Sequence, residues 1–266
     1  MRALLLLFAL FPLPLFASDP PVATILAYHE VDPAANIQAR RPRLHATGDA
    51  QSEGLRYVAT VENFEAQMQY LRQNDYHVIP LEQLVGFLKG EVAALPPRAV
   101  VITIDDGWTC TYTEVLPRLK EYGMPFTAFI YPGIIGKGSH LMTWNQVAAA
   151  AREGVDVESH AYTHPLLARK INGHVAPADY SAFLRHELLD SKAEIGKRTD
   201  RKVRYLCYPF GDYDEAVVAA AKQYGYEAAL TTRRGPITRS TPLFELRRYL
   251  IHNDTTLDEF KTFLLP

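Results

Sequence analysis

Short apolar runs alternate along this chain with longer segments in which apolar residues recur every three or four positions. The runs bounded by Gly, Pro, Asp or Asn are predicted to be strands. Several of them are apolar at almost every position, which is typical of a parallel sheet with both faces covered. The predicted strands cover residues 23–27, 77–79, 99–104, 126–130, 155–158, 204–207, 228–231 and 246–251.

The segments between these strands carry helix signals. Thr60 is placed to cap a helix with apolar positions from Val61 to Leu71, and Thr143 is placed to cap the predicted helix 144–152. Residues 32–58 are polar and are predicted to form a loop. The predicted helices cover residues 61–71, 81–88, 112–122, 144–152, 180–199, 214–224 and 257–264.

Repeated strand–helix units indicate an α/β fold with a parallel sheet, and no linker or repeat indicates a second domain. Polar residues that could take part in a reaction follow several different strands. This favours a β/α barrel, in which such residues gather at one mouth of the barrel. A doubly wound open sheet also binds ligands at strand ends and is the alternative. The residues concerned are His29, Asp105, Asp106, His160, His164 and Phe210.

The N-terminus has a different composition. Arg2 precedes an apolar stretch from residue 3 to residue 16, and Ala17 precedes a polar segment. This pattern predicts a secretory signal peptide over residues 1–17, with a mature domain over 18–266. The alternative, an uncleaved anchor, is disfavoured because the stretch is short and contains Pro12 and Pro14. We therefore expect export to the periplasm or the extracellular space, without a stable membrane anchor.

Charge and cysteine content narrow the picture further. The chain has 266 residues and a formal net charge of -2, which gives no electrostatic basis for binding nucleic acid. Its two cysteines, Cys110 and Cys207, both follow predicted strand ends. Export permits a disulfide between them, and two small buried thiols are the alternative.

Two polar clusters carry the strongest chemical signal. Thr103 to Gly107 places two adjacent aspartates after a buried strand, and Ser159 to His164 places two histidines after another. Four-residue spacing on one helical turn would put both imidazoles on one side. One Asp and two His can hold a divalent metal ion with a position left open, and the other Asp is then available as a base. Zinc suits this set best, and cobalt, nickel or iron also fit.

Other residues at strand ends are candidates for supporting roles. His29 ends the first strand, and His252, which follows the last, is its rival as a proton donor. The tight loop Tyr208 to Gly211 could direct a backbone N–H at a developing oxyanion.

These motifs resemble those of the NodB-homology polysaccharide deacetylases, carbohydrate esterase family 4. Thr103 to Gly107 resembles the family's Thr-Phe-Asp-Asp-Gly, and Ser159 to His164 resembles its His-Ser/Thr-x-x-His. The run from Met142 to Gly154 is similar to the segment that precedes the histidines in that family. The resemblance covers essentially the whole mature chain and implies a distorted (β/α)7 barrel.

The resemblance also implies roles for individual residues. It makes Asp105 the general base and Asp106, His160 and His164 the ligands of one divalent metal ion. It makes Phe210 the backbone donor to the oxyanion. The early position of His29 is similar to the circularly permuted branch that acts on poly-β-1,6-N-acetylglucosamine, in which this histidine is the general acid.

Two departures from the family pattern stand out. The Arg-x-Pro-Tyr motif is replaced here by the segment from Cys207 to Phe210, so the arginine that would hold the base aspartate is missing from its place. Arg247 or Arg248 is the predicted substitute. The sequence also lacks an Asp-x-x-Asp-Trp motif, which leaves the partner of His29 undefined.

The sequence thus predicts a metal-dependent N-deacetylase, and the presence of both motifs disfavours a non-catalytic binding protein. Its expected partner is a polysaccharide that contains N-acetylglucosamine, and the expected state is a monomer. The preferred substrate is poly-β-1,6-N-acetylglucosamine, and peptidoglycan or chitooligosaccharides are the alternatives. A non-catalytic glycan-binding protein and a hydrolase of non-sugar amides are the alternatives from other classes.

Overall fold

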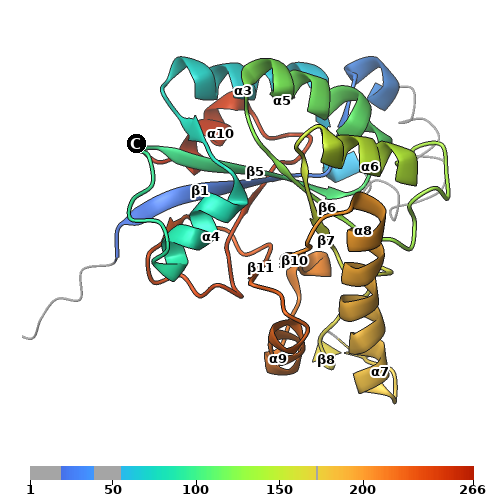
Figure 1. Ribbon diagram of the computed structural model, residues 1–266. Helices are drawn as coiled ribbons and strands as arrows, with labels where there is room; N and C mark the ends of the chain where they lie inside the picture. Colours follow the sequence, from blue (N-terminus) through green and yellow to red (C-terminus); the bar gives the residue numbers. More distant parts are fainter. Residues whose placement is uncertain (1–18, 39–54, 172) are drawn as a thin grey trace, which may run out of the picture.

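A large curled sheet, with nine strands among the described residues, organises the molecule, as the computed structural model shows (Figure 1). The structure describes residues 19–38, 55–171 and 173–266. Within them, parallel strands follow the spatial order β11, β10, β7, β6, β5 and β1. Their bounds are β1 Pro21–Tyr28, β5 Ala99–Asp106, β6 Thr127–Ile130, β7 Asp156–Ser159, β10 Tyr205–Cys207 and β11 Ala228–Leu230.

The last strand of the chain joins the two ends of this sheet. β13 (Tyr249–Leu250) pairs in parallel with β1, and shortly before it Leu246 forms a parallel bridge with Leu230 of β11. The N–H of Thr231 also donates to the carbonyl of Leu246 at 2.8 Å. The sheet therefore curls into the predicted distorted (β/α)7 barrel, and the alternative of a doubly wound open sheet is wrong.

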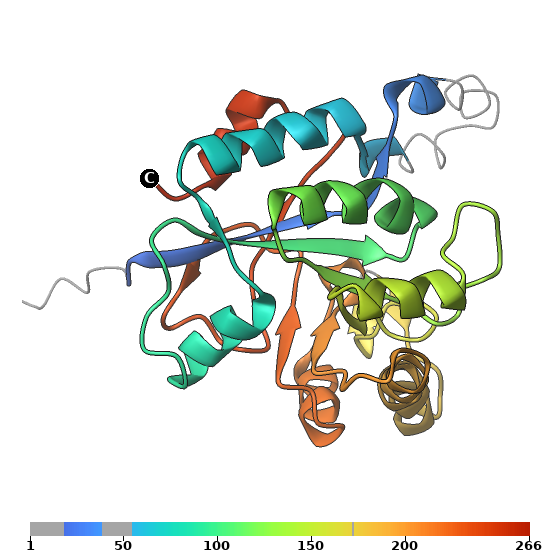
Figure 2. The same cartoon turned by 45° about the horizontal axis from the view of Figure 1, so that its top comes forward.

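Helices surround the barrel in both views (Figures 1 and 2). Two of them begin at the predicted caps: the hydroxyl of Thr60 accepts from the N–H of Asn63 at 3.0 Å, and Thr143 forms a capping box with Gln146. Their bounds are α3 Val61–Gln73, α4 Leu81–Lys89, α5 Leu116–Tyr122, α6 Trp144–Arg152, α7 Tyr180–Leu184, α8 Ser191–Thr199, α9 Glu215–Gln223 and α10 Leu257–Phe263.

Two predicted helices contain a π-helical turn. The predicted helix 180–199 is interrupted at Arg185–Asp190, between α7 and α8, and the predicted helix 112–122 begins with one at Thr111–Val115. A π turn inserts an extra residue without a break in the chain direction, so periodicity alone does not reveal it.

Several short strands were not expected from the sequence. Strands of two or three residues are too short to show a period, which explains why they escaped the prediction. By contrast, the short strand β4 (His77–Val78) was predicted, as residues 77–79. The unexpected strands are β2 Glu30–Asp32, β3 Val58–Thr60, β8 Lys170–Ile171, β9 His174–Val175 and β12 Ile237–Thr238.

Two apolar layers explain why the strands are apolar at nearly every position. Successive residues of a strand point to opposite faces, so Ile25 packs in one buried cluster and Leu26 in the other. The first cluster includes Val101, Phe129 and Tyr205 and fills the barrel. The second lies between the strands and the surrounding helices.

Part of the predicted organisation lies outside the described residues. This applies to the predicted signal peptide, residues 1–17, and to residues 39–54 of the predicted loop. The bounds 18–266 of the mature domain therefore stay a prediction. In the described part of the chain, every helix is too short or too polar to cross a membrane.

Candidate metal centre and active site

The two aspartates at the end of β5 point in different directions. Asp105 is 1% exposed and faces the barrel interior, whereas Asp106 has a φ of 79° and turns away at the mouth. Gly107 continues the turn with a φ of 98°, and a Cβ there would lie 2.9 Å from the Cδ1 of Ile135. Glycine is thus required to let the chain leave the strand in this direction.

The two histidines lie on a loop after β7, so the predicted helical turn is wrong. Ala161 and His164 have φ values of 61° and 62°, which no right-handed helix allows. The loop still brings the imidazole rings of His160 and His164 together, with ring centroids 4.6 Å apart. Left-handed turns, rather than helical spacing, produce this approach.

Glu187 holds this loop in place. Its carboxylate accepts hydrogen bonds from the N–H of Tyr162 at 2.9 Å and from both the N–H and the hydroxyl of Thr163, at 2.8 and 2.7 Å. Glu187 is 2% exposed and comes from the π turn between α7 and α8. These bonds satisfy the backbone groups that a helix would otherwise pair, which explains the irregular conformation.

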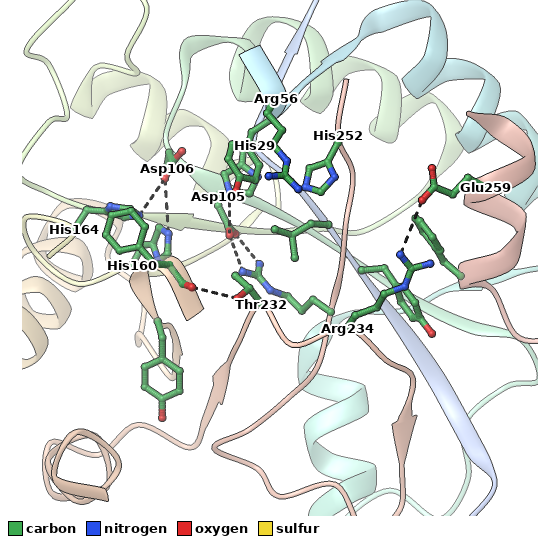
Figure 3. Close-up of a pocket in the computed structure, with 17 residues that line it drawn as sticks. His29, Arg56, Asp105, Asp106, His160, His164, Thr232, Arg234, His252 and Glu259 are labelled. Carbon is green, nitrogen blue, oxygen red and sulfur yellow. Dashed lines mark hydrogen bonds and ion pairs between the residues drawn. The ribbon is translucent and has the colours of Figure 1, made fainter. Parts of the chain in front are cut away.

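Asp106, His160 and His164 converge on one point (Figure 3). The Oδ1 of Asp106 lies 3.7 Å from the Nε2 of each histidine. Ligands that share one zinc ion at about 2.0–2.2 Å are separated by roughly 3–4 Å, so this spacing suits a shared ion. The three residues predicted as metal ligands are therefore brought together as expected.

The state of the imidazoles also suits a metal ion. The Nδ1–H of His160 donates to the carbonyl of Cys207 at 2.8 Å, which leaves the lone pair of Nε2 directed at Asp106. Burial lowers the pKa of His160, and burial together with His160 lowers the pKa of His164 to about 4. Both rings are neutral at pH 7, as metal ligation requires.

Trp108 orients the aspartate of this site and was not anticipated from the sequence. Its indole Nε1–H donates to the Oδ2 of Asp106 at 3.0 Å, which leaves Oδ1 directed at the histidines. A hydrogen bond of this kind fixes a ligand before the metal binds.

Replacement of Trp108 by phenylalanine tests this contribution. An aromatic ring is kept and the indole N–H is lost, so we expect the Kd for zinc to rise about 10- to 100-fold. A competition titration against a chromophoric chelator measures this change. An unchanged Kd in a folded variant would show that the indole does not orient Asp106.

Arg248 is the partner of Asp105. Its Nη1 and Nη2 donate to the two carboxylate oxygens at 2.9 and 2.8 Å, and its Nε donates to the carbonyl of Thr231 at 2.9 Å. Arg248 is 1% exposed, whereas Arg247 is exposed. The arginine missing after β10 is thus replaced by Arg248, one of the two predicted substitutes.

The ion pair keeps Asp105 ionised. Burial alone would raise the pKa of Asp105, but the charge of the Arg248 guanidinium and its two hydrogen bonds outweigh this effect, and the pKa lies below its usual value. An ionised carboxylate is the form that a general base needs at neutral pH.

The two cysteines are not paired. The Sγ of Cys110 accepts from the N–H of Val31, and the Sγ of Cys207 lies 3.0 Å from the Nη2 of Arg248. Cys207 also lies near Asp105 and His160, a second set of possible ligands. Burial raises the pKa of the Cys207 thiol well above its usual value, and Arg248 already occupies both oxygens of Asp105. This second set is therefore unsuited to a metal.

His29 lies beside the predicted base. β1 and β5 pair with Tyr28 opposite Ile104, so the next residues, His29 and Asp105, are neighbours, with Nε2 and Oδ2 3.9 Å apart. Tyr57 lies between His29 and His252, with ring centroids 4.8 and 5.4 Å away. The Nδ1 of His29 is buried and has no hydrogen-bond partner among the described residues. His29 is thus better placed than its rival for proton transfer.

Phe210 lies at the rim of the site. It has a φ of 59° in the turn Pro209–Gly211, and its ring, 57% exposed, meets the ring of His164 edge-on at 4.6 Å. Its carbonyl accepts from the hydroxyl of Thr232 at 3.1 Å. The predicted role of its N–H as an oxyanion donor stays a prediction.

These residues line one elongated cavity of about 480 Å³. Figure 3 shows Asp106, His160 and His164 at one end and Arg234 and Glu259 at the other.

The chain is similar to known polysaccharide deacetylases. The family model described as polysaccharide deacetylase matches residues 93–229. The YxkH protein of Bacillus subtilis (strain 168), named for the same family, is 31% identical over 188 residues, which cover 70% of this chain and 63% of that protein. The poly-beta-1,6-N-acetyl-D-glucosamine N-deacetylase of Staphylococcus epidermidis is 27% identical over 204 residues, covering 74% of this chain and 69% of that protein.

A solved structure supports the fold. The Streptococcus pyogenes deacetylase PplD, in complex with acetate, superimposes with a TM-score of 0.75 at 22% identity, over 93% of this chain and 100% of that one. The barrel described above is therefore shared with a solved deacetylase structure.

Proposed function

Because this chain belongs to the polysaccharide deacetylase family, we propose that it is a hydrolase that removes N-acetyl groups from a polysaccharide of N-acetylglucosamine. One observation carries the proposal: three metal-ligating side chains converge beside a buried aspartate that is ion-paired with an arginine. A metal site next to an ionised base is what hydrolysis of an unactivated amide needs.

Asp106, His160 and His164 would hold the ion, with zinc as the first choice from this donor set. When bound, such an ion acts as a Lewis acid toward the acetamide and makes water easier to deprotonate. The other residues then have distinct tasks in the same cavity.

Asp105 accepts the proton from the attacking water, and Arg248 fixes the orientation of its carboxylate. His29, on the same side of the cavity, delivers a proton to the leaving amine. The N–H of Phe210 donates a hydrogen bond to the oxyanion of the tetrahedral intermediate. The products are acetate and a glucosamine unit.

Poly-β-1,6-N-acetylglucosamine is the substrate we favour. The name of the Staphylococcus epidermidis relative and the position of His29 immediately after the first strand support this choice. The apolar N-terminus supports action outside the cytoplasm, and we expect a monomer. A deacetylase of peptidoglycan or chitooligosaccharides is the second candidate, since the same site serves any N-acetylglucosamine unit.

Acetate release from three substrates tests the proposal: β-1,6-linked N-acetylglucosamine oligomers, β-1,4-linked chitooligomers and peptidoglycan. We expect release mainly from the β-1,6 oligomers. Release mainly from either of the other two would retain the activity and change the substrate. A metal-loaded protein that releases acetate from none of them would contradict the deacetylase function.

A further inference from the structure

The end of the cavity away from the metal ligands is rich in cations. Figure 3 places Arg56 near His252 between the two ends, and Arg234 with Glu259 at the far end. Neither arginine belongs to the motifs that predicted the metal centre. Their surroundings show whether their guanidinium groups are already occupied.

The side chain of Arg56 is exposed, and its guanidinium carbon lies 6.0 Å from the ring centroid of Tyr57. Among the described residues, the guanidinium has no ion-pair partner. Its backbone is fixed, because its carbonyl accepts from the N–H of Asn253 at 2.9 Å. The positive charge of Arg56 is also felt by His252 in the cavity lining. Burial lowers the pKa of His252 most, and the charge of Arg56 lowers it further.

Arg234 is positioned by aromatic rings rather than by a strong ion pair. Its guanidinium carbon lies 4.6 Å from the ring centroid of Phe263 and 5.5 Å from that of Tyr249. Its contact with Glu259 is 3.9 Å long, beyond hydrogen-bond distance. The rings hold the side chain at the cavity wall while its N–H donors face solvent.

From these contacts we propose that the far end binds a carboxylate on the sugar unit next to the N-acetylglucosamine that is deacetylated. The inference rests on the proposed deacetylase function and specifies its substrate class. A guanidinium binds a carboxylate through two parallel hydrogen bonds, and a planar donor on an aromatic ring is preorganised for this.

The distribution of charge favours an anion over a cation at this end. Arg56 and Arg234 line this part of the cavity together with one carboxylate, that of Glu259, so the ammonium group of a deacetylated neighbour would be repelled. This surplus of positive charge therefore favours placement of an acidic unit at this end of the cavity.

Two kinds of glycan supply such a group: peptidoglycan, through the lactyl ether of muramic acid, and a β-1,6-linked polymer that carries an acidic ester. Each is tested against a neutral match. The first pair is a muramic-acid-containing tetrasaccharide and its methyl ester, and the second is a β-1,6 tetramer with and without an O-succinyl group.

The readout is the ratio of kcat/KM for the acidic oligomer to that for its neutral match. We expect a ratio of roughly five or more in at least one pair at low salt, falling toward one in 0.5 M NaCl. The double variant Arg56→Gln, Arg234→Gln should bring the ratio to about one. Arg152→Gln removes an exposed arginine of α6 and should leave the ratio as in the wild type.

The pair that shows the preference identifies the source of the carboxylate. Ratios near one in both pairs for the wild type, with acetate released from all oligomers, would overturn the inference and leave the deacetylase function standing. A preference that persists in the double variant would also overturn it. Absence of acetate from every oligomer would instead contradict the proposed function.

Discussion

Replacing Asp105 with asparagine is expected to lower kcat by roughly 10²- to 10⁴-fold, the usual contribution of a general base. Asparagine keeps the shape and one acceptor oxygen for Arg248, but it cannot take a proton from water. Because Asp105 does not belong to the trio that converges on the metal position, one equivalent of zinc should stay bound.

Metal content and turnover must be measured on the same preparation. Asp106→Asn provides the comparison, because it alters a metal ligand and should weaken zinc binding as well as activity. A fully active Asp105→Asn enzyme would show that the base is another residue. Loss of zinc from Asp105→Asn would move this residue from the base to the ligand set.

Truncation of Arg248 to alanine is expected to reduce the free energy of unfolding by about 3–5 kcal/mol. The reason is that Asp105, 1% exposed, would be left as a buried charge without its partner. Activity should fall as well, because the carboxylate would lose both of the hydrogen bonds that fix its orientation.

The neighbouring arginine is the matched control for this variant. Arg247 is exposed, so Arg247→Ala should change the free energy of unfolding by less than about 0.5 kcal/mol. Urea denaturation of both variants measures the difference. Equal stability of the two would contradict the role of Arg248, and so would wild-type turnover in Arg248→Ala.

The chemistry of this site could largely be predicted because its parts end apolar strands. Asp105 and Asp106 follow β5, and His160 follows β7, so a parallel sheet must bring them to one edge. The same reasoning placed His29 at the end of β1, next to Asp105. Local sequence was sufficient for these residues because the strand directions fix where they lie.

Residues that reach the site from segments far away in the sequence could not be assigned in this way. Two adjacent arginines were equivalent in the sequence, and only the structure shows that, just before β13, Arg248 is buried inside the barrel and Arg247 is exposed. Glu187 gave no signal, because a π turn carries it to the histidine loop. That loop was mistaken for a helical turn, since four-residue spacing does not reveal left-handed backbone angles.

We expect this chain to need one divalent ion, held by Asp106, His160 and His164, to release acetate. The experiment strips the protein with a chelator and then follows acetate release from β-1,6-linked N-acetylglucosamine oligomers as zinc is added back. We predict that activity is lost on stripping and returns in proportion to zinc until one ion is bound per chain. Undiminished acetate release from a protein shown by elemental analysis to contain no metal would contradict the proposed role of the ion.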